Sequence, residues 1–391
     1  MNLNNTSNTI RENARNRFLS FGYGLFIHYG VYSVAGRGEW LMSRERMTPE
    51  EYFSVLNQFN NTPEIADDWV ATAVKSGMKY AVLTTRHHDG YLIGKKLIRR
   101  FCDKCREYGI GIGLYHSVGD WTDMDFRNGP SGAKWQDFVN RNRERELELV
   151  TEYGKIDYLF YDGCPRPETW NCAELNNELR SIQPHLLISS RCGIEEDISS
   201  SEQNTRVHQG VWESCFTMNN SWGHVPYDKE WKTPLRLEKL LMNIRHNGGN
   251  FLLNVGPDAN GRIGDTEKSI LTEIAEWLKI NQEAVFDIEP HPFNYHDQEI
   301  SVGKGENIYI SLNKDWDTPE RVICGIGNKV KKIQLLGDNT DINFFQDEEH
   351  LRFKLPLKLN ADTLRILKLV IEGEPFGIPN NMWPKDNFRV C

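Results

Sequence analysis

The feature that most constrains the fold is a repeated succession of helical segments and short apolar runs that end in polar side chains. The clearest run covers residues 156–163, which are largely apolar and aromatic until Asp162 and a glycine end it. A run this short predicts a strand buried on both faces, and its C-terminal edge is where parallel α/β folds place reactive groups. For a lone Asp-Gly pair, a turn that merely closes the strand is the better interpretation, so the neighbouring runs decide between the two.

The same succession recurs along most of the chain. Strands are predicted at about residues 21–30, 79–85, 110–115, 156–162, 185–190, 211–217 and 250–255; helices are predicted to begin at Thr48 and to cover about 64–75, 97–108, 135–153, 173–182, 235–246 and 265–281. Alternation of this kind predicts parallel strands joined by right-handed crossovers. This many units predict an α/β fold with a TIM-like (β/α) barrel that is less regular in its second half.

The pattern of apolar and turn residues changes near residue 290. Beyond it, short alternating runs such as 308–312 and 332–336 are separated by turn residues, which is typical of antiparallel strands. We therefore predict a catalytic barrel domain over residues 1–290 and a C-terminal antiparallel β-sandwich domain over residues 291–391.

Charge and hydropathy exclude two classes of partner. The 391 residues carry a net charge of -9, which leaves no domain-wide basic surface to neutralise nucleic-acid phosphates. The first ten residues have neither a basic nor an apolar signal region, and no later stretch is long and apolar enough to span a bilayer. We expect a cytoplasmic protein that binds neither nucleic acid nor membrane, or a periplasmic or secreted one if a leader has been removed.

The eight cysteines do not form a metal-binding pattern. Only Cys102 and Cys105 have the CxxC spacing, within a predicted helix and without a second pair nearby. Half-buried helix residues are the better interpretation, and free thiols suit a reducing compartment. We predict neither a metal ion nor a cofactor.

Histidines, carboxylates and tryptophans collect at the predicted strand ends. The candidates are His28, Glu39, Trp40, His87, His88, Tyr115, Asp162, Arg191 and the acids from Glu195 to Glu202. Such a set suits either a divalent metal or a sugar, whose hydroxyls bond to His and Arg while Trp covers a ring face. Adjacent histidines on a strand point to opposite faces, which favours the sugar.

Hydrolysis of a glycosidic bond needs two carboxylates, one ionised and one that donates a proton. Asp162 suits the ionised role because a short side chain at a strand end is held rigidly. The proton donor would come from the next unit along the chain, where Glu195, Glu196, Asp197, Glu202 and Glu213 remain open candidates.

Several motifs together resemble the α-L-fucosidases of glycoside hydrolase family 29. They occur in the same order from about residue 21 to 290: Phe26-Ile27-His28-Tyr29-Gly30, Gly38-Glu39-Trp40, His87-His88-Asp89-Gly90, Gly113-Leu114-Tyr115-His116-Ser117, Asp120-Trp121, Tyr153-Gly154-Lys155-Ile156-Asp157, Asp162-Gly163, Trp222-Gly223-His224 and the stretch from Gly248 to Pro257. The resemblance implies a barrel followed by a β-sandwich.

It also implies a retaining exo-glycosidase that removes terminal α-linked L-fucose without a metal. Asp162 matches the family's nucleophile, and Glu202, within Ser199-Ser200-Ser201-Glu202-Gln203, resembles its acid/base. The resemblance further implies that sugar hydroxyls are held by His28, Glu39, Trp40, His87, His88, Tyr115 and Arg191, while Phe26 and Phe160 line a pocket for the C6 methyl group.

Two segments are shorter than the family pattern: Gly94 follows Ile93 without the usual polar loop, and few residues separate Glu202 from Trp212. These shortened loops keep a carbohydrate-binding protein without catalysis open as an alternative. A second alternative is a metal-dependent hydrolase that uses His28, His87, His88 and Asp162.

Overall fold

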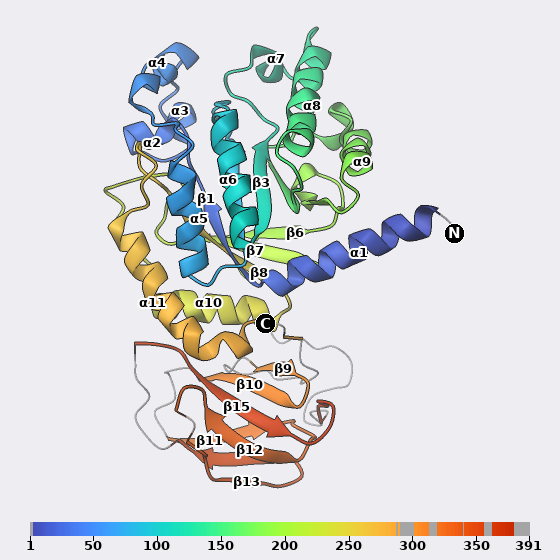
Figure 1. Ribbon diagram of the computed structural model, residues 1–391, viewed down its shortest axis with the longest axis vertical. Coiled ribbons are helices and arrows are strands. Elements are labelled where there is room, and N and C mark those ends of the chain that lie inside the picture. The colour runs from blue at the N-terminus through green and yellow to red at the C-terminus, as the bar shows by residue number, and fades with distance from the viewer. Residues whose placement is uncertain are drawn as a thin grey trace. The chain divides into compact units, whose positions relative to one another are not determined.

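The computed structural model describes residues 3–286, 288–289, 301–312, 319–338, 340–355 and 362–378. The chain divides into two compact units (Figure 1), one comprising residues 1–233 and 249–275 and the other residues 234–248 and 276–391. The predicted boundary between residues 290 and 291 falls inside the second unit, and as a domain boundary it stays a prediction.

The first unit is built on one parallel sheet of eight strands in the order β5-β4-β3-β2-β1-β8-β7-β6. The strands are β1 (Tyr23–Ile27), β2 (Tyr80–Arg86), β3 (Gly111–Ser117), β4 (Tyr158–Asp162), β5 (Leu187–Ile188), β6 (Ser199–Glu202), β7 (Trp212–Thr217) and β8 (Asn250–Val255). A parallel bridge between Ser189 and Ile198 joins the two outer strands. The sheet therefore closes into the predicted barrel, and all strand C-termini face the same end.

The register of the strands decides which side chains meet at that end. Ser117 on β3 lies level with Asp162 on β4, and Glu202 on β6 lies level with Cys215 on β7. Asn254 on β8 lies level with Phe26 on β1.

Most connections contain the predicted helices. The longer ones are α1 (Leu3–Phe21), α5 (Ile65–Lys75), α6 (Lys95–Tyr108), α8 (Trp135–Thr151), α9 (Cys172–Ile182), α10 (Pro234–His246) and α11 (Asp265–Asn281); the short ones are α2 (Tyr32–Ala35), α3 (Leu41–Arg44), α4 (Pro49–Phe53) and α7 (Met124–Arg127). The capping box predicted at Thr48 is present and begins α4. Gly94 is the N-cap of α6, so the helix begins directly after the shortened segment.

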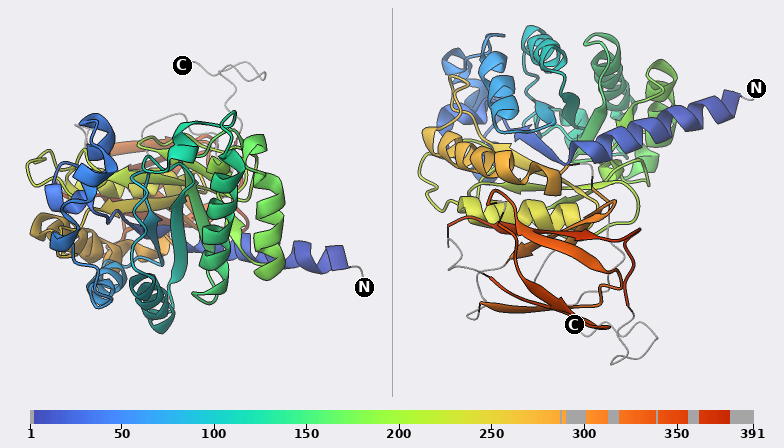
Figure 2. Two further views of the ribbon diagram at one scale, coloured as in Figure 1. Left: turned by 90° about the horizontal axis from the view of Figure 1, so that it is seen from above. Right: turned by 60° about the horizontal axis from the view of Figure 1, so that its bottom comes forward.

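Helix α1 was not predicted from the sequence. Its first turns extend beyond the barrel helices in both views of Figure 2, whereas its last turns close the N-terminal end of the barrel. There Phe18 packs on Tyr80 and Tyr158 with ring centroids 5.4 and 5.2 Å apart, and its carbonyl accepts a hydrogen bond from Asn250. Above these rings, the same buried cluster continues through Phe26, Tyr115 and Phe160.

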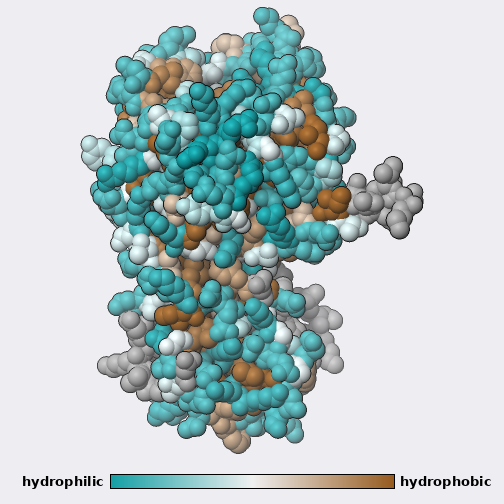
Figure 3. Space-filling model, in the orientation of Figure 1, coloured by the Kyte–Doolittle hydropathy of each residue, from teal (hydrophilic) through white to brown (hydrophobic). Residues whose placement is uncertain are grey.

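The outer surface of this unit is mainly hydrophilic on the face drawn in Figure 3. This follows from amphipathic helices such as α6, which buries Leu97, Ile98 and Phe101 and leaves its charged residues outside. None of the helices described combines the length and apolar character needed to cross a bilayer.

The second unit contains two antiparallel sheets, in the orders β12-β15-β10-β9 and β11-β14-β13. Their strands are β9 (Ser301–Lys304), β10 (Asn307–Leu312), β11 (Glu320–Cys324), β12 (Val330–Leu335), β13 (Phe344–Gln346), β14 (His350–Lys354) and β15 (Arg365–Ile371). One apolar cluster draws on both sheets, including Ile310, Leu369 and Phe353. This is the sandwich predicted for the C-terminal part.

Candidate active site

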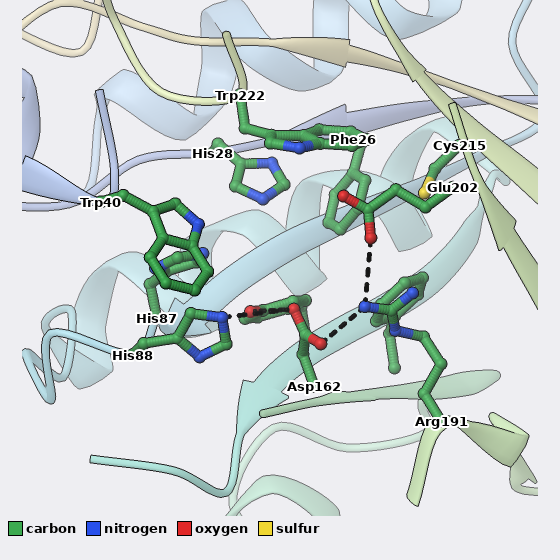
Figure 4. Close-up of a pocket in the computed structure, with 12 residues that line it drawn as sticks. Phe26, His28, Trp40, His87, His88, Asp162, Arg191, Glu202, Cys215 and Trp222 are labelled. Atoms are coloured by element: carbon green, nitrogen blue, oxygen red, sulfur yellow. Dashed lines mark hydrogen bonds and ion pairs between the residues drawn. The ribbon is translucent and has the colours of Figure 1, made fainter. Parts of the chain in front are cut away.

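A pocket of about 120 Å³ lies at the C-terminal ends of the barrel strands (Figure 4). The residues that line it are Phe26, His28, Trp40, His87, His88, Tyr115, Phe160, Asp162, Arg191, Glu202, Cys215 and Trp222. The structure thus brings ten of the eleven predicted site residues together, and Glu39 is the exception.

Asp162 lies at the end of β4 and is surrounded by polar side chains. Arg191 Nη2 donates to Oδ1 at 2.6 Å, the Tyr115 hydroxyl donates to Oδ2 at 2.9 Å, and His88 Nε2 lies 3.5 Å from Oδ2. Burial acts to raise the pKa of this carboxyl, but the charge of Arg191 and the hydrogen bonds from Arg191 and Tyr115 outweigh it and hold the pKa below its usual range. Asp162 is therefore an ionised group in a largely enclosed place.

Arg191 connects the two carboxylates of the pocket, as Figure 4 shows. Its Nη2 lies 2.6 Å from Asp162 Oδ1 and 3.3 Å from Glu202 Oε2, so these two oxygens are at most 5.9 Å apart. The side chain of Glu202 is 42% exposed and that of Asp162 is 23% exposed. One carboxylate is thus held by a cation at the base of the pocket, and the other reaches toward solvent.

Three histidines form one wall of the pocket. His87 lies between His28 and His88, with ring centroids 5.7 and 4.2 Å away, and stacks on Tyr115. Burial is the main cause that lowers the pKa of all three imidazoles, and the pKa of His28 falls to about 3. At neutral pH these rings are uncharged hydrogen-bonding groups for a polar ligand.

Tryptophans cover the mouth of the pocket. Trp40 is 40% exposed, and its ring packs against Trp121 and His88 with centroids 5.0 and 5.5 Å away. Trp222 lies on the other side, 5.1 Å from the ring of His28. Half-exposed aromatic faces of this kind suit the apolar face of a sugar ring.

Among the five open candidates for the second acid, only Glu202 lines the pocket. Glu195 is exposed, Glu196 pairs with Arg180, and Asp197 is buried in ion pairs with Arg11, Arg15 and Arg180. In the described part of the chain, Arg191 forms its ion pairs with Asp162 and Glu202.

Glu213, the fifth candidate, lies inside the barrel on β7. Its carboxyl accepts hydrogen bonds from the hydroxyls of Tyr158 at 2.6 Å and Tyr80 at 3.0 Å. Burial raises its pKa to about 7, although these hydrogen bonds act in the opposite direction. Glu213 therefore belongs to the polar centre of the barrel core rather than to the pocket.

Glu39 acts on the backbone behind the pocket. It is 5% exposed, and its Oε2 accepts a hydrogen bond from the N–H of Gly223 at 2.9 Å. This contact holds the segment that carries Trp222. A direct bond from Glu39 to a sugar hydroxyl stays a prediction.

Sequence reasoning assigned no role to two lining residues. Trp222 belongs to a quoted motif, and its carbonyl is held by Asn254 Nδ2 at 2.7 Å. Cys215 lies two residues after Glu213 on β7, so strand alternation places both side chains on the inner face of the barrel. That alternation was the available signal for Cys215.

The described residues contain no group of three or more His, Cys, Asp or Glu side chains arranged to hold a metal ion. Cys102 and Cys105, the CxxC pair, lie on α6 as predicted. Both are fully buried, so the prediction that they are half-buried is wrong. Burial raises the pKa of the Cys102 thiol to about 12. Such a thiol is a poor metal ligand at neutral pH because the thiolate is the binding form.

Gly163 allows the close packing behind Asp162. Its φ is +57°, and a Cβ there would lie 2.7 Å from His88 Nδ1 and 2.9 Å from Ser117 Oγ. We expect Gly163→Ala to lower the free energy of unfolding by about 2–4 kcal/mol, measured by urea denaturation, because backbone strain and a clash add. Gly109→Ala is the matched control: its φ is +70° with no atom within 4 Å, so only the strain of about 1 kcal/mol applies. Equal losses in the two variants would contradict the clash.

A (β/α) barrel whose strand ends bring two carboxylates together with histidines and tryptophans in one pocket is typical of the class of glycoside hydrolases. Comparison with known proteins identifies which one. The model of the family described as "Alpha-L-fucosidase" matches residues 2–283, so the chain belongs to the α-L-fucosidase family.

Individual relatives agree with this assignment. The chain is 27% identical to the tissue α-L-fucosidase of Bos taurus over 390 residues, which covers 82% of this chain and 80% of the relative. It is 26% identical to the α-L-fucosidase of Dictyostelium discoideum over 331 residues, which covers 68% and 70%. Among solved structures, α-L-fucosidase isoenzyme 1 from Paenibacillus thiaminolyticus superposes with a TM-score of 0.85 at 27% identity and covers 93% of this chain and 100% of that chain.

Proposed function

We propose that this α-L-fucosidase removes terminal α-linked L-fucose from a glycan by double displacement, with Asp162 as nucleophile and Glu202 as acid/base. The observation that carries the proposal is the position of Arg191 Nη2 between the two carboxylates, which limits their nearest oxygens to at most 5.9 Å. Retaining enzymes separate the two groups by about 5–5.5 Å, and inverting enzymes by about 6.5–9.5 Å to admit a water.

The unequal surroundings of the two groups support this division of roles. A nucleophile must stay ionised, and Asp162 is held so by Arg191 and by the hydrogen bond from Tyr115. An acid/base must exchange protons with the leaving group and with water, and Glu202 is the more exposed carboxyl.

In the first step, an oxygen of Asp162 attacks the anomeric carbon as the glycosidic bond breaks. Glu202 gives its proton to the departing oxygen, so the leaving group is released as a neutral alcohol. In the second step, Glu202 takes a proton from water, the water oxygen attacks the anomeric carbon, and the bond to Asp162 breaks. Fucose leaves with its original anomeric configuration, and both carboxyl groups return to their starting states.

Other lining residues suit the shape of fucose. Phe26 and Phe160 pack on each other with centroids 5.2 Å apart and offer an apolar surface to the C6 methyl group. The histidine wall and Trp40 would hold the ring hydroxyls and one ring face.

The test is a mechanism-based label. 2-Deoxy-2-fluoro-α-L-fucosyl fluoride should inactivate the enzyme, because the fluorine at C2 slows the second step more than the first and the fucosyl-enzyme accumulates. Peptide mapping should find the added mass on Asp162, and excess L-fucose should slow the labelling. A label on Glu202 would reverse the proposed roles, and an unlabelled protein that binds fucose without turnover would support the carbohydrate-binding alternative. Loss of turnover on adding a chelator would favour the metal-dependent hydrolase.

A further inference from the structure

Two pocket histidines are held from behind by polar side chains that do not themselves line the pocket. His88 Nδ1 lies 2.6 Å from the Ser117 hydroxyl, and His28 Nδ1 lies 2.6 Å from the side-chain oxygen of Asn254. A neutral imidazole carries one proton on one of its two nitrogens. The partner at Nδ1 therefore determines whether the other nitrogen, Nε2, is a hydrogen-bond donor or an acceptor toward the sugar.

For His88, the single proton of the Ser117 hydroxyl determines the tautomer. The Ser117 hydroxyl donates to the carbonyl oxygen of Gly119 at 2.7 Å, and a carbonyl can only accept. Its oxygen is therefore left to accept a hydrogen bond from His88, so the proton of the imidazole must be on Nδ1. Nε2 is then unprotonated and lies on the Asp162 side of the ring.

For His28, the orientation of the Asn254 side-chain amide determines the tautomer. Its Nδ2 donates to the carbonyl oxygen of Trp222 at 2.7 Å, which fixes the orientation of the amide. The amide oxygen faces His28 Nδ1 and accepts its proton, so Nε2 of this ring is unprotonated as well. No side chain in the described part of the chain donates to Nε2 of His28 or of His88.

The neutral state on which this argument depends has a physical cause. Both rings are buried, which lowers their pKa, and for His88 the opposing effect of Asp162 does not compensate. Neither ring is therefore an imidazolium near pH 7, in which both nitrogens would donate.

We propose that Ser117 and Asn254 are positioning residues that fix His88 and His28 as Nδ1–H tautomers, so that each ring accepts a hydrogen bond from one sugar hydroxyl at Nε2. The identity of the sugar rests on the proposed function, whereas the tautomers do not.

A consequence for recognition follows at His88. Its Nε2 and Asp162 Oδ2 are 3.5 Å apart and are both acceptors, and Oδ2 already receives the proton of Tyr115. A sugar hydroxyl that donates between these two atoms relieves the repulsion of their lone pairs. A ligand group that cannot donate, such as an ether or a fluorine, leaves that repulsion in place.

The tautomers can be read directly in the intact full-length protein without substrate. Nitrogen-15 NMR of protein labelled at histidine distinguishes a protonated ring nitrogen from an unprotonated one, and His28→Gln and His88→Gln assign the two rings by loss of signal. We expect Nδ1 protonated and Nε2 unprotonated in both rings at pH 7. A proton on Nε2 of either ring, or a doubly protonated ring, would overturn the inference for that ring.

Ser117→Ala tests the cause. Without the serine oxygen, the His88 spectrum should change toward a mixture of tautomers, and KM for a fucoside should rise about tenfold with a smaller change in kcat. Ser76→Ala is the matched control, because Ser76 is also buried and donates to a backbone carbonyl at 2.7 Å but lies on the C-terminal end of α5. It should change neither the spectrum nor KM.

An unchanged His88 tautomer in Ser117→Ala would show that Ser117 does not determine it, even if KM rises. If Ser117→Ala does not fold, the spectrum of the unaltered protein still decides the assignment. If no fucoside is hydrolysed, the proposed function fails while the NMR result keeps its meaning.

Discussion

Asp162→Gly should lower kcat for an aryl α-L-fucoside by about 10⁴-fold or more, because the covalent step has no nucleophile. The glycine also leaves space beside Arg191, whose cation then lacks its 2.6 Å partner. Added azide should enter this space, attack the anomeric carbon as the aryl group leaves, and restore turnover. The product should be β-L-fucosyl azide, since one displacement inverts the configuration.

Azide should have no such effect on the unaltered enzyme, which supplies the control. Proton NMR of the product gives the anomeric configuration, and the rate of aryl release gives kcat. Undiminished activity of Asp162→Gly without azide would end the assignment of Asp162 as nucleophile. Rescue with α-L-fucosyl azide as the product would transfer that role to another side chain.

Glu202→Ala should have an effect that depends on the leaving group. A fucosylated oligosaccharide leaves as a poor alkoxide and needs the proton of Glu202, so kcat/KM should fall about 10²–10⁴-fold. An aryl fucoside with an acidic phenol needs little assistance, so its first step should be nearly unchanged and the second step should limit turnover. Azide should then accelerate turnover and yield α-L-fucosyl azide, because it attacks the fucosyl-enzyme.

Glu195→Ala is the matched control for this prediction. Glu195 is an exposed acid of the same segment that does not line the pocket, so both substrates should react at the unaltered rate. An equal loss on both substrates in Glu202→Ala would mean that Glu202 positions the sugar and does not transfer a proton. The opposite azide products of the two catalytic variants separate the two roles in one assay.

The barrel was predictable because its elements repeat a strong local pattern. Buried strands such as β2 and β4 begin with apolar and aromatic runs, and helices such as α6 have one apolar face. Strand β6 was not predicted because Ser199–Glu202 has neither an apolar run nor an apolar alternation. It is a strand because the backbone of β7 pairs with it along its whole length, which is a tertiary cause that the local sequence does not carry.

Helix α1 was missed for a related reason. Its first residues are polar and rich in Asn, which has low helix propensity. Contacts distant in sequence stabilise it instead: Arg11 and Arg15 bind Asp197 at 2.8 and 2.7 Å, and Phe18 is buried in the barrel. Helix propensity alone cannot predict partners that lie some 180 residues away.

The sequence was enough to predict which residues gather at the site, but it was not enough to choose the second catalytic acid. Parallel strands place their C-terminal residues at one end, so the assembly of His28, His88, Asp162 and Arg191 follows from the order of elements. The choice among the five acids does not follow from that order, because it depends on which carboxyl groups are bound by other side chains of the protein. Asp197 and Glu213 are occupied by arginines and tyrosines respectively, whereas Glu202 faces the pocket.

The closed lower end of the barrel restricts how substrate and product can move. Because Phe18, Tyr80 and Tyr158 fill the space beneath the pocket floor, no channel runs along the axis of the described barrel. Substrate therefore reaches the carboxylates from the end of the barrel at which the strands terminate. The liberated monosaccharide must depart through the opening by which the next branch arrives, so accumulating product competes with incoming substrate.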